Sequence, residues 1–309
     1  MQLNKIRIPG KVMLSGEYAV LYGAKSVLVP VPRYLELSES IAPPEISRSK
    51  VVDIALKYHI PQIEAYESEA GIPNIEIDRS EFYAKNSTSE SVKLGLGGSA
   101  AEAVGVVSLR YKRAGLKPAD YSDEIFKHAV TIHNQAQTGL GSGADVALCS
   151  YGKPLKFSIF KQSHQIEFIN FDKIENYIPL HLVWTGQPAD TRKLVSRFQN
   201  QFADNNKEIL NKLINVSDRL AGSWFVSSQK EVFELIDEFN ETMRECASIA
   251  DMPYRLPIHD ELEVWAKNNS GRAKPTGAGG GDMILLVGDL PIEQIKRLVI
   301  PLKNTIAII

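Results

Sequence analysis

Residues 94–99 read Leu94-Gly95-Leu96-Gly97-Gly98-Ser99, and a long run of small and apolar residues follows them. We predict that this run, from Ala100 to about Arg113, is a helix with Ser99 as its N-cap. Glycines allow backbone N–H groups to come close to a ligand, and the first turn of a helix attracts anions. The stretch is therefore a candidate cradle for phosphate groups, although it matches neither a Walker A loop nor the dinucleotide-binding fingerprint.

Two other glycine-containing segments lie far from this one, at Pro9-Gly10-Lys11 and at Lys274 to Asp282. Any one of the three could be a simple turn, but three in one chain favour a ligand-binding role. Apolar residues follow Lys11, so its charge needs a partner near the core. Asp145 is the candidate partner, because it follows the turn Gly141-Ser142-Gly143 and precedes apolar residues.

Asp145 has two possible roles. An aspartate in the first turn of a helix commonly compensates the helix dipole and does nothing else. Beside a lysine, however, its carboxylate would stay ionised and could accept or orient a substrate hydroxyl. The sequence leaves both roles open.

Composition places the chain among ordinary globular proteins. It has 309 residues, of which 44% are hydrophobic and 23% charged, so it is long enough for two domains. The net charge of −2 argues against a nucleic-acid partner. The two cysteines have no metal-like spacing, the N-terminus lacks the apolar core of a signal peptide, and no run of residues is apolar enough to span a membrane. We expect a cytoplasmic protein.

The pattern of apolar residues predicts an α+β fold in two lobes. We expect β structure over the first forty residues, a loop over 80–91, and a change from mixed structure to mainly helix near residue 180. This change divides the chain into domains 1–180 and 181–309. Further helices are predicted at 47–58, 122–135, 191–267 (with breaks near two prolines) and 292–298, and further strands at 155–160, 166–169, 180–184 and 283–287.

Three segments in register resemble the motifs of the GHMP small-molecule kinases. They are Ile8 to Gly23, Gly95 to Ala101, and Lys274 to Asp282. The resemblance covers nearly the whole chain. It implies an N-terminal lobe with a left-handed βαβ unit, a ferredoxin-like C-terminal lobe, and a site between the lobes. Within the family, the segments Gly141 to Ala147 and Trp184 to Thr191 are most similar to phosphomevalonate kinases.

The chain departs from the family pattern at three points. Gly98 stands where the second motif usually has a first serine. Residues 133–135 (His-Asn-Gln) contain no carboxylate where some members have a glutamate that binds metal. Asp190 stands where phosphomevalonate kinases often have serine, and its charge would repel a substrate phosphate, which keeps mevalonate kinase open as an alternative.

The resemblance implies an ATP-dependent kinase that uses Mg²⁺ and converts 5-phosphomevalonate to 5-diphosphomevalonate. Lys11 and Asp145 would be catalytic, and Ser99 would face the metal. ATP phosphates would bind at Gly95, Leu96, Gly97, Gly98, Ser99 and Ala100. The substrate would contact Lys11, Ser142, Thr185, Thr191, Arg192, Lys274, Thr276, Gly277, Ala278 and Gly279. Less favoured alternatives are a mevalonate-diphosphate-decarboxylase-like enzyme and a non-catalytic nucleotide-binding relative. We expect a monomer or homodimer.

Overall fold

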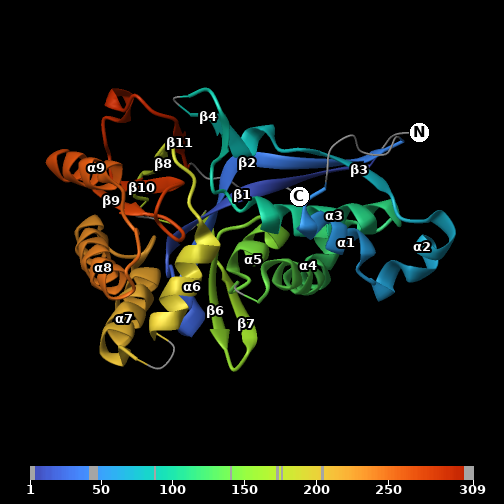
Figure 1. Cartoon of the computed structure of the whole chain (residues 1–309), viewed down its shortest axis with the longest axis horizontal. Helices are drawn as coiled ribbons and strands as arrows, with labels where there is room; N and C mark the ends of the chain where they lie inside the picture. Colours follow the sequence, from blue (N-terminus) through green and yellow to red (C-terminus); the bar gives the residue numbers. More distant parts are fainter. Residues whose placement is uncertain are drawn as a thin grey trace.

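Two long antiparallel strands, β1 (Lys5–Ser15) and β2 (Ser26–Ser40), run through one lobe of the computed structural model (Figure 1). The structure describes residues 4–41, 48–86, 88–139, 141–171, 174, 177–202 and 205–302. β2 also pairs with β3 (Asn74–Asp78) and β6 (Leu155–Phe160), and β6 pairs with β7 (Ser163–Phe168). The result is a five-stranded sheet in the order β1-β2-β6-β7, with β3 beside β2.

Helices cover one face of this sheet. α3 (Gly98–Arg113) and α5 (Ala144–Tyr151) pack directly on β1 and β2, while α4 (Ser122–Gln137) lies against both helices. α1 (Lys50–Lys57) packs on α3 and α4, and α2 (Glu64–Ala70) follows it at the far end of the lobe (Figure 1). The starts of α3 and α5 therefore lie beside β1, where the first glycine segment is.

The second lobe is built on a four-stranded antiparallel sheet in the order β11-β8-β10-β9. Its strands are β8 (Leu180–Trp184), β9 (Arg272–Pro275), β10 (Met283–Val287) and β11 (Val299–Pro301). Numbered along the chain, this order is 4-1-3-2, as in a ferredoxin-like sheet. α8 (Gln229–Ile249) and α9 (Pro257–Asn268) pack on it, and α7 (Lys207–Ser223) packs on α8.

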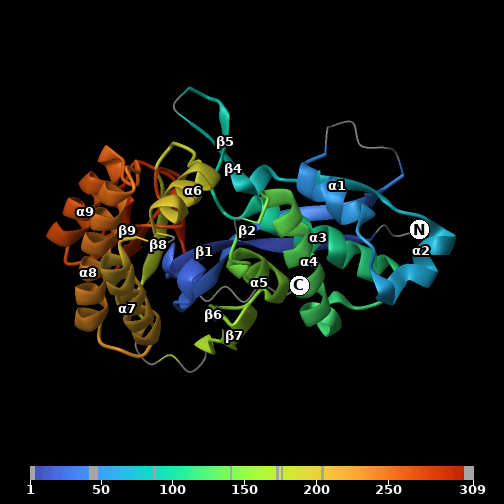
Figure 2. The same cartoon turned by 60° about the horizontal axis from the view of Figure 1, so that its bottom comes forward.

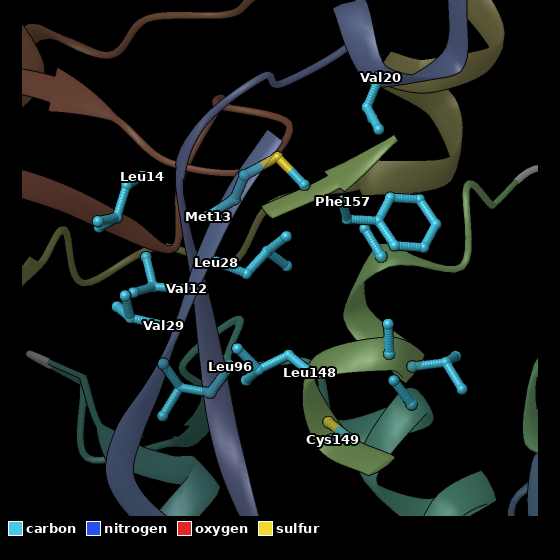
Figure 3. Close-up of a cluster of buried hydrophobic side chains, with 14 of the residues drawn as sticks. Val12, Met13, Leu14, Val20, Leu28, Val29, Leu96, Leu148, Cys149 and Phe157 are labelled. Atoms are coloured by element: carbon cyan, nitrogen blue, oxygen red, sulfur yellow. The ribbon is translucent and has the colours of Figure 1, made fainter. Parts of the chain in front are cut away.

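The two lobes share one buried apolar cluster, because α7 also contacts β1 and β2. Figure 3 shows part of this cluster, in which Val12 of β1 and Val29 of β2 lie with Leu148 of α5 and Leu96 of the central glycine stretch. α6 (Thr191–Phe202) lies at the junction of the lobes in both views (Figures 1 and 2). Within the described residues, no helix is both long and apolar enough to cross a lipid bilayer.

Most predicted elements are confirmed, including the helix after the central glycine stretch, the strands of residues 155–184 and the strand at 283–287. The helix predicted at 47–58 is seen at Lys50–Lys57, and residue 47 lies outside the described residues. The helical stretch predicted at 191–267 consists of α6 to α9. Strands change from the first sheet to the second between β7 and β8, and the division into domains 1–180 and 181–309 stays a prediction.

Three local predictions are wrong. The N-cap of α3 is Gly97, in the left-handed conformation with φ of 82°, so α3 begins before Ser99. The predicted loop at 80–91 contains a 3-10 turn (Ser80–Phe82) and a hairpin, β4 (Tyr83–Lys85) with β5 (Ser91–Lys93), which projects from the molecule (Figure 2). The helix predicted at 292–298 is a short 3-10 turn, Ile292–Gln294, before β11, because Ile300 is buried by pairing with β8.

Candidate active site

Lys11 and Asp145 form an ion pair at the junction of three elements. The Lys11 ammonium on β1 lies 3.1 Å from the Asp145 carboxylate at the start of α5. The backbone N–H of Lys11 donates to the carbonyl of Leu96, which ties the first glycine segment to the second. The Lys11 side chain is 10% exposed and that of Asp145 is 36% exposed, so the pair meets solvent mainly through its carboxylate.

The charge of Lys11 is stabilised where it lies. Burial lowers the pKa of its ammonium, but the attraction and hydrogen bond of Asp145, with smaller contributions from Cys149 and Asp282, outweigh burial and raise that pKa above its usual value. Lys11 is therefore a cation throughout the neutral range, held next to a carboxylate that solvent and ligands can reach.

The glycines of the central stretch leave room for side chains from other motifs. Gly97 has a φ of 82°, and a Cβ atom there would lie 2.8 Å from both Cγ and Cε of Lys11. Gly95 has a φ of 75°, and a Cβ atom there would lie 2.3 Å from the carboxylate carbon of Asp282. Both positions need glycine for two reasons, the left-handed backbone and the neighbouring side chain.

A cavity of about 870 Å³ brings most of the predicted site residues together. It lies between the lobes and contains the Lys11–Asp145 pair. Its lining includes the predicted residues Lys11, Gly95, Leu96, Gly97, Gly98, Ser99, Ser142, Asp145, Thr191, Arg192, Thr276, Gly277 and Ala278. Four predicted site residues, Ala100, Thr185, Lys274 and Gly279, do not line this cavity.

Lys274 lies behind the cavity wall in a second ion pair. Its side chain is 0% exposed, and its ammonium donates to the carboxylate of Glu17, whose side chain is 1% exposed, and to the carbonyl of Pro275. Burial lowers the pKa of Lys274 and raises that of Glu17, and the attraction between them opposes both changes. Contact between Lys274 and a substrate stays a prediction, and it requires a ligand to reach a side chain that is 0% exposed in this structure.

Two of the other three residues outside the cavity lining shape the backbone. The Thr185 hydroxyl donates to the carbonyl of Asp282, and the backbone N–H of Thr185 donates to the same oxygen. Gly279 lies under the ring of Tyr254, where a Cβ atom would approach the ring to 2.3 Å. Ala100 is buried in the first turn of α3. In this structure, Thr185 and Gly279 thus hold the loops that line the cavity.

Ser99 has a partner that sequence analysis missed. Its hydroxyl lies 3.0 Å from Nε2 of His133, on α4. Burial lowers the pKa of His133, although the nearby Asp145 carboxylate opposes this effect, so the ring is neutral at pH 7. The only sequence signal for His133 is its place in the segment where a carboxylate was expected.

The donor set around Ser99 fits Mg²⁺ bound mainly through substrate phosphates. Among the described residues, no three His, Cys, Asp or Glu side chains are grouped as a metal site. Mg²⁺ commonly keeps several waters and takes only one or two protein ligands besides phosphate oxygens. The Ser99 hydroxyl lies at the cavity wall in the first turn of α3, and its role as a metal ligand stays a prediction.

The first residues of α6 form the opposite wall of the cavity. Asp190, Thr191 and Arg192 all line it. A carboxylate oxygen of Asp190 accepts a hydrogen bond from the backbone N–H of Lys193, as an N-cap residue does. Serine is also a favoured N-cap, so aspartate at this position preserves the cap while adding a negative charge. Arg192 donates to the side-chain oxygen of Gln137 on α4, across the junction of the lobes.

The far end of the cavity, beyond the central glycine stretch, is lined by Arg79, Phe82, Tyr83, Lys93 and Glu102, among others. Arg79 donates from two nitrogens to one carboxylate oxygen of Glu102, at 2.7 Å each. The segment 80–93, most of which was predicted as a loop, contributes three of these residues.

Comparison with known proteins agrees with this fold. Residues 51–153 match the family described as "GHMP kinases N terminal domain". The chain is 25% identical to the phosphomevalonate kinase of Saccharolobus solfataricus, over 92% of this chain and 90% of that protein. It is also 25% identical to the mevalonate kinase of the same organism, over 94% and 92%. The structure of Streptococcus pneumoniae phosphomevalonate kinase in complex with phosphomevalonate and AMPPNP superposes with a TM-score of 0.74 at 15% identity, covering 94% of each chain. Residues 51–153 thus match the N-terminal domain of the GHMP kinases, and the whole chain shares the fold of the solved phosphomevalonate kinase structure.

Proposed function

We propose that this protein is an ATP-dependent kinase of the mevalonate pathway that transfers a phosphoryl group to 5-phosphomevalonate and forms 5-diphosphomevalonate. The observation that carries the proposal is the Lys11–Asp145 pair, which lies beside the glycine-rich start of α3 in one cavity. The first turn of a helix can bind ATP phosphates through its backbone N–H groups. A lysine next to an accessible carboxylate can stabilise negative charge at the phosphoryl group that is transferred. The related phosphomevalonate kinases support the choice of acceptor.

Phosphoryl transfer asks the protein mainly for positioning and for stabilisation of negative charge. The backbone N–H groups of Gly95 to Ser99 would hold the ATP phosphates, with Ser99 toward Mg²⁺. The bound Mg²⁺ supplies positive charge that neutralises these phosphates. Lys11 adds a second positive charge at the transferred group. The acceptor phosphate is largely ionised at neutral pH, so Asp145 acts more by holding Lys11 in place than by removing a proton.

The acceptor side of the cavity supports a phosphorylated substrate. Arg192 brings a cation to its lining, next to Thr191 at the start of α6. Ser142, Thr276, Gly277 and Ala278 line the remaining wall. The specific observation that favours mevalonate instead is the Asp190 carboxylate in the same lining, because it would repel a phosphate. Relatives named mevalonate kinase are equally similar to the chain.

Measuring kcat/KM for both acceptors, with ATP and Mg²⁺ in a coupled assay of ADP release, tests the proposal. We expect a clear preference for phosphomevalonate. A preference for mevalonate would contradict the proposed acceptor and would leave the proposed kinase activity standing. Absence of ADP release with either acceptor would favour a non-catalytic nucleotide-binding protein. Release of CO₂ along with ADP from mevalonate diphosphate would favour a decarboxylase.

Two neighbouring cations on α6 provide a matched pair of variants. Arg192 lines the cavity and Lys193 does not. Arg192→Gln should raise KM for phosphomevalonate by about one to two orders of magnitude, because a charge-assisted hydrogen bond contributes roughly 1.5–3 kcal/mol. Lys193→Gln should leave KM nearly unchanged. Equal effects of the two substitutions would argue against a direct contact between Arg192 and the substrate.

A further inference from the structure

Asp282, at the end of the third glycine segment, holds the segment that leads into α6. Its carbonyl accepts hydrogen bonds from the backbone N–H of Thr185, at 2.9 Å, and from the Thr185 hydroxyl, at 3.0 Å. Its backbone N–H donates to the carbonyl of Gln187, at 2.7 Å. One oxygen of its carboxylate accepts from the backbone N–H of Ala189, at 3.1 Å. Both the backbone and the side chain of Asp282 therefore fix residues 185–189.

The same carboxylate lies directly against the central glycine stretch. A Cβ atom at Gly95 would come within 2.3 Å of the carboxylate carbon and of one carboxylate oxygen of Asp282. The carboxylate thus occupies the space that a side chain at residue 95 would need. Asp282 also lines the cavity, so this contact between the lobes lies at the site itself.

The backbone of Asp282 is held in an uncommon conformation. Its φ is 53°, in the left-handed region that side chains other than those of asparagine and aspartate rarely adopt. Burial raises the pKa of its carboxyl group, while the hydrogen bond from Ala189 and the attraction of Lys11 and Lys93 oppose this change. These features fit a residue whose place is set by contacts from both lobes.

We propose that Asp282 is a positioning residue that holds the acceptor-binding segment against the phosphate-binding loop. Residues 185–189 lead directly to Asp190, Thr191 and Arg192 at the cavity wall, and Gly95 begins the loop that would hold ATP phosphates. The inference rests on the proposed function for the identity of the two ligands. Phosphoryl transfer requires the acceptor oxygen in line with the transferred group, and a misplacement of about 1 Å can reduce the rate about a hundredfold. Asp282 would set that alignment by holding the two segments together.

Two substitutions of Asp282 separate its shape from its charge. Asparagine tolerates the left-handed conformation, and its amide oxygen can still accept from Ala189. Alanine removes the carboxylate that accepts from Ala189 and leaves only a Cβ atom beside Gly95. We expect Asp282→Ala to lower kcat at least about thirtyfold, with both KM values within about threefold of wild type. Asp282→Asn should retain kcat within about fivefold.

Asp251 provides a control, because it is a second aspartate with a left-handed backbone (φ of 46°) and lies outside the main cavity. Asp251→Ala should leave kcat unchanged.

Hydrogen–deuterium exchange gives a readout that needs no acceptor substrate. The backbone N–H of Ala189 should exchange faster in Asp282→Ala than in wild type, and it should stay protected in Asp282→Asn. Unchanged protection in the alanine variant would overturn the inference, as would equal loss of kcat in both Asp282 variants or a rise in KM at constant kcat. If the wild-type protein phosphorylates neither acceptor, the proposed function fails, whereas exchange at Ala189 still decides whether Asp282 holds the segment.

Discussion

Two lysine–carboxylate pairs join distant parts of this chain, and their surroundings differ. Lys11 and Asp145 lie within the N-terminal lobe, and Asp145 is 36% exposed, whereas Glu17 and Lys274 connect the two lobes and are almost fully buried, with Glu17 in the cavity lining. Asp145 raises the pKa of Lys11, while burial lowers the pKa of Lys274 despite its partner. An ion pair with one accessible carboxylate can act on a ligand, but a pair in which both side chains are buried mainly constrains structure.

A neighbouring contact supports the structural role of the buried pair. The hydroxyl of Tyr18, next to Glu17, donates to the carbonyl of Ala278 at 2.6 Å. The segment after β1 is thus attached to the third glycine segment through two consecutive side chains. The first motif therefore has two parts, one at the cavity through Lys11 and one at the lobe interface through Glu17 and Tyr18.

The largest effect, a loss of stability, should come from breaking the buried Glu17–Lys274 pair. Lys274→Met leaves the Glu17 carboxyl buried without its cation, and removal of one partner of a buried pair costs about 3–5 kcal/mol of unfolding free energy. Denaturant unfolding measures this loss. Glu17→Leu combined with Lys274→Met removes both charges and should be less destabilised than Lys274→Met alone. A stable Lys274→Met variant with a tenfold or larger rise in KM for phosphomevalonate would instead support Lys274 as a substrate ligand.

Breaking the Lys11–Asp145 pair should affect catalysis and leave the stability of the protein nearly unchanged. Asp145→Asn should lower kcat at least about a hundredfold, which corresponds to about 2.7 kcal/mol of activation free energy. ATP affinity, measured by calorimetry, should hardly change, because the backbone of the glycine stretch is unaltered. Activity within about threefold of wild type would remove Asp145 from the mechanism.

Substitutions at the adjacent residues Gly97 and Gly98 test whether kcat depends on the position of the Lys11 side chain. Gly97→Ala forces a side chain into a left-handed backbone and against the Lys11 stem, so we expect kcat to fall about tenfold, in line with a strain of roughly 1–3 kcal/mol. Gly98 is helical, and a Cβ atom there would meet only the Phe82 ring at 3.7 Å. Gly98→Ala should therefore keep kcat near wild type. Equal losses in the two variants would mean that the Lys11 contact is not the cause.

The smallest expected effect is the pH dependence of the unfolding free energy. The direction of this dependence differs between Lys274 and Lys11. The folded protein has a lowered pKa at Lys274, so the unfolded chain binds more protons as pH approaches 10.5, and the Lys274 contribution to stability rises with pH. The pKa of Lys11 is raised, so its contribution is constant below 10.5 and is lost only above that value. Urea unfolding of wild type, Lys11→Met and Lys274→Met at pH 8, 9 and 10 measures both trends. The difference from wild type should change with pH for Lys274→Met alone.

Local pattern was sufficient to predict most helices and strands, and it failed where a distant partner determined the structure. The local pattern predicts a helix over 292–298, whereas the structure has only a short 3-10 turn at Ile292–Gln294, and Val299 and Ile300 directly after this segment pair with β8. Ser99 is displaced from the N-cap because Gly97 adopts a left-handed backbone and the Lys11 stem crosses it. In both places the deciding contact lies more than 80 residues away along the chain.

By itself, the sequence determined the three glycine-containing segments and the α+β character, and it indicated Asp145 as the candidate partner of Lys11. These follow from residue type and from local spacing, because glycine permits close backbone approach and a buried lysine needs a carboxylate. Only the tertiary structure decided that Lys274 is enclosed by Glu17, that Ser99 faces His133, and that Asp282 rests on Gly95. Each of these contacts joins residues from separate elements. Their geometry depends on how the helices and sheets pack, and that packing is a property of the whole fold.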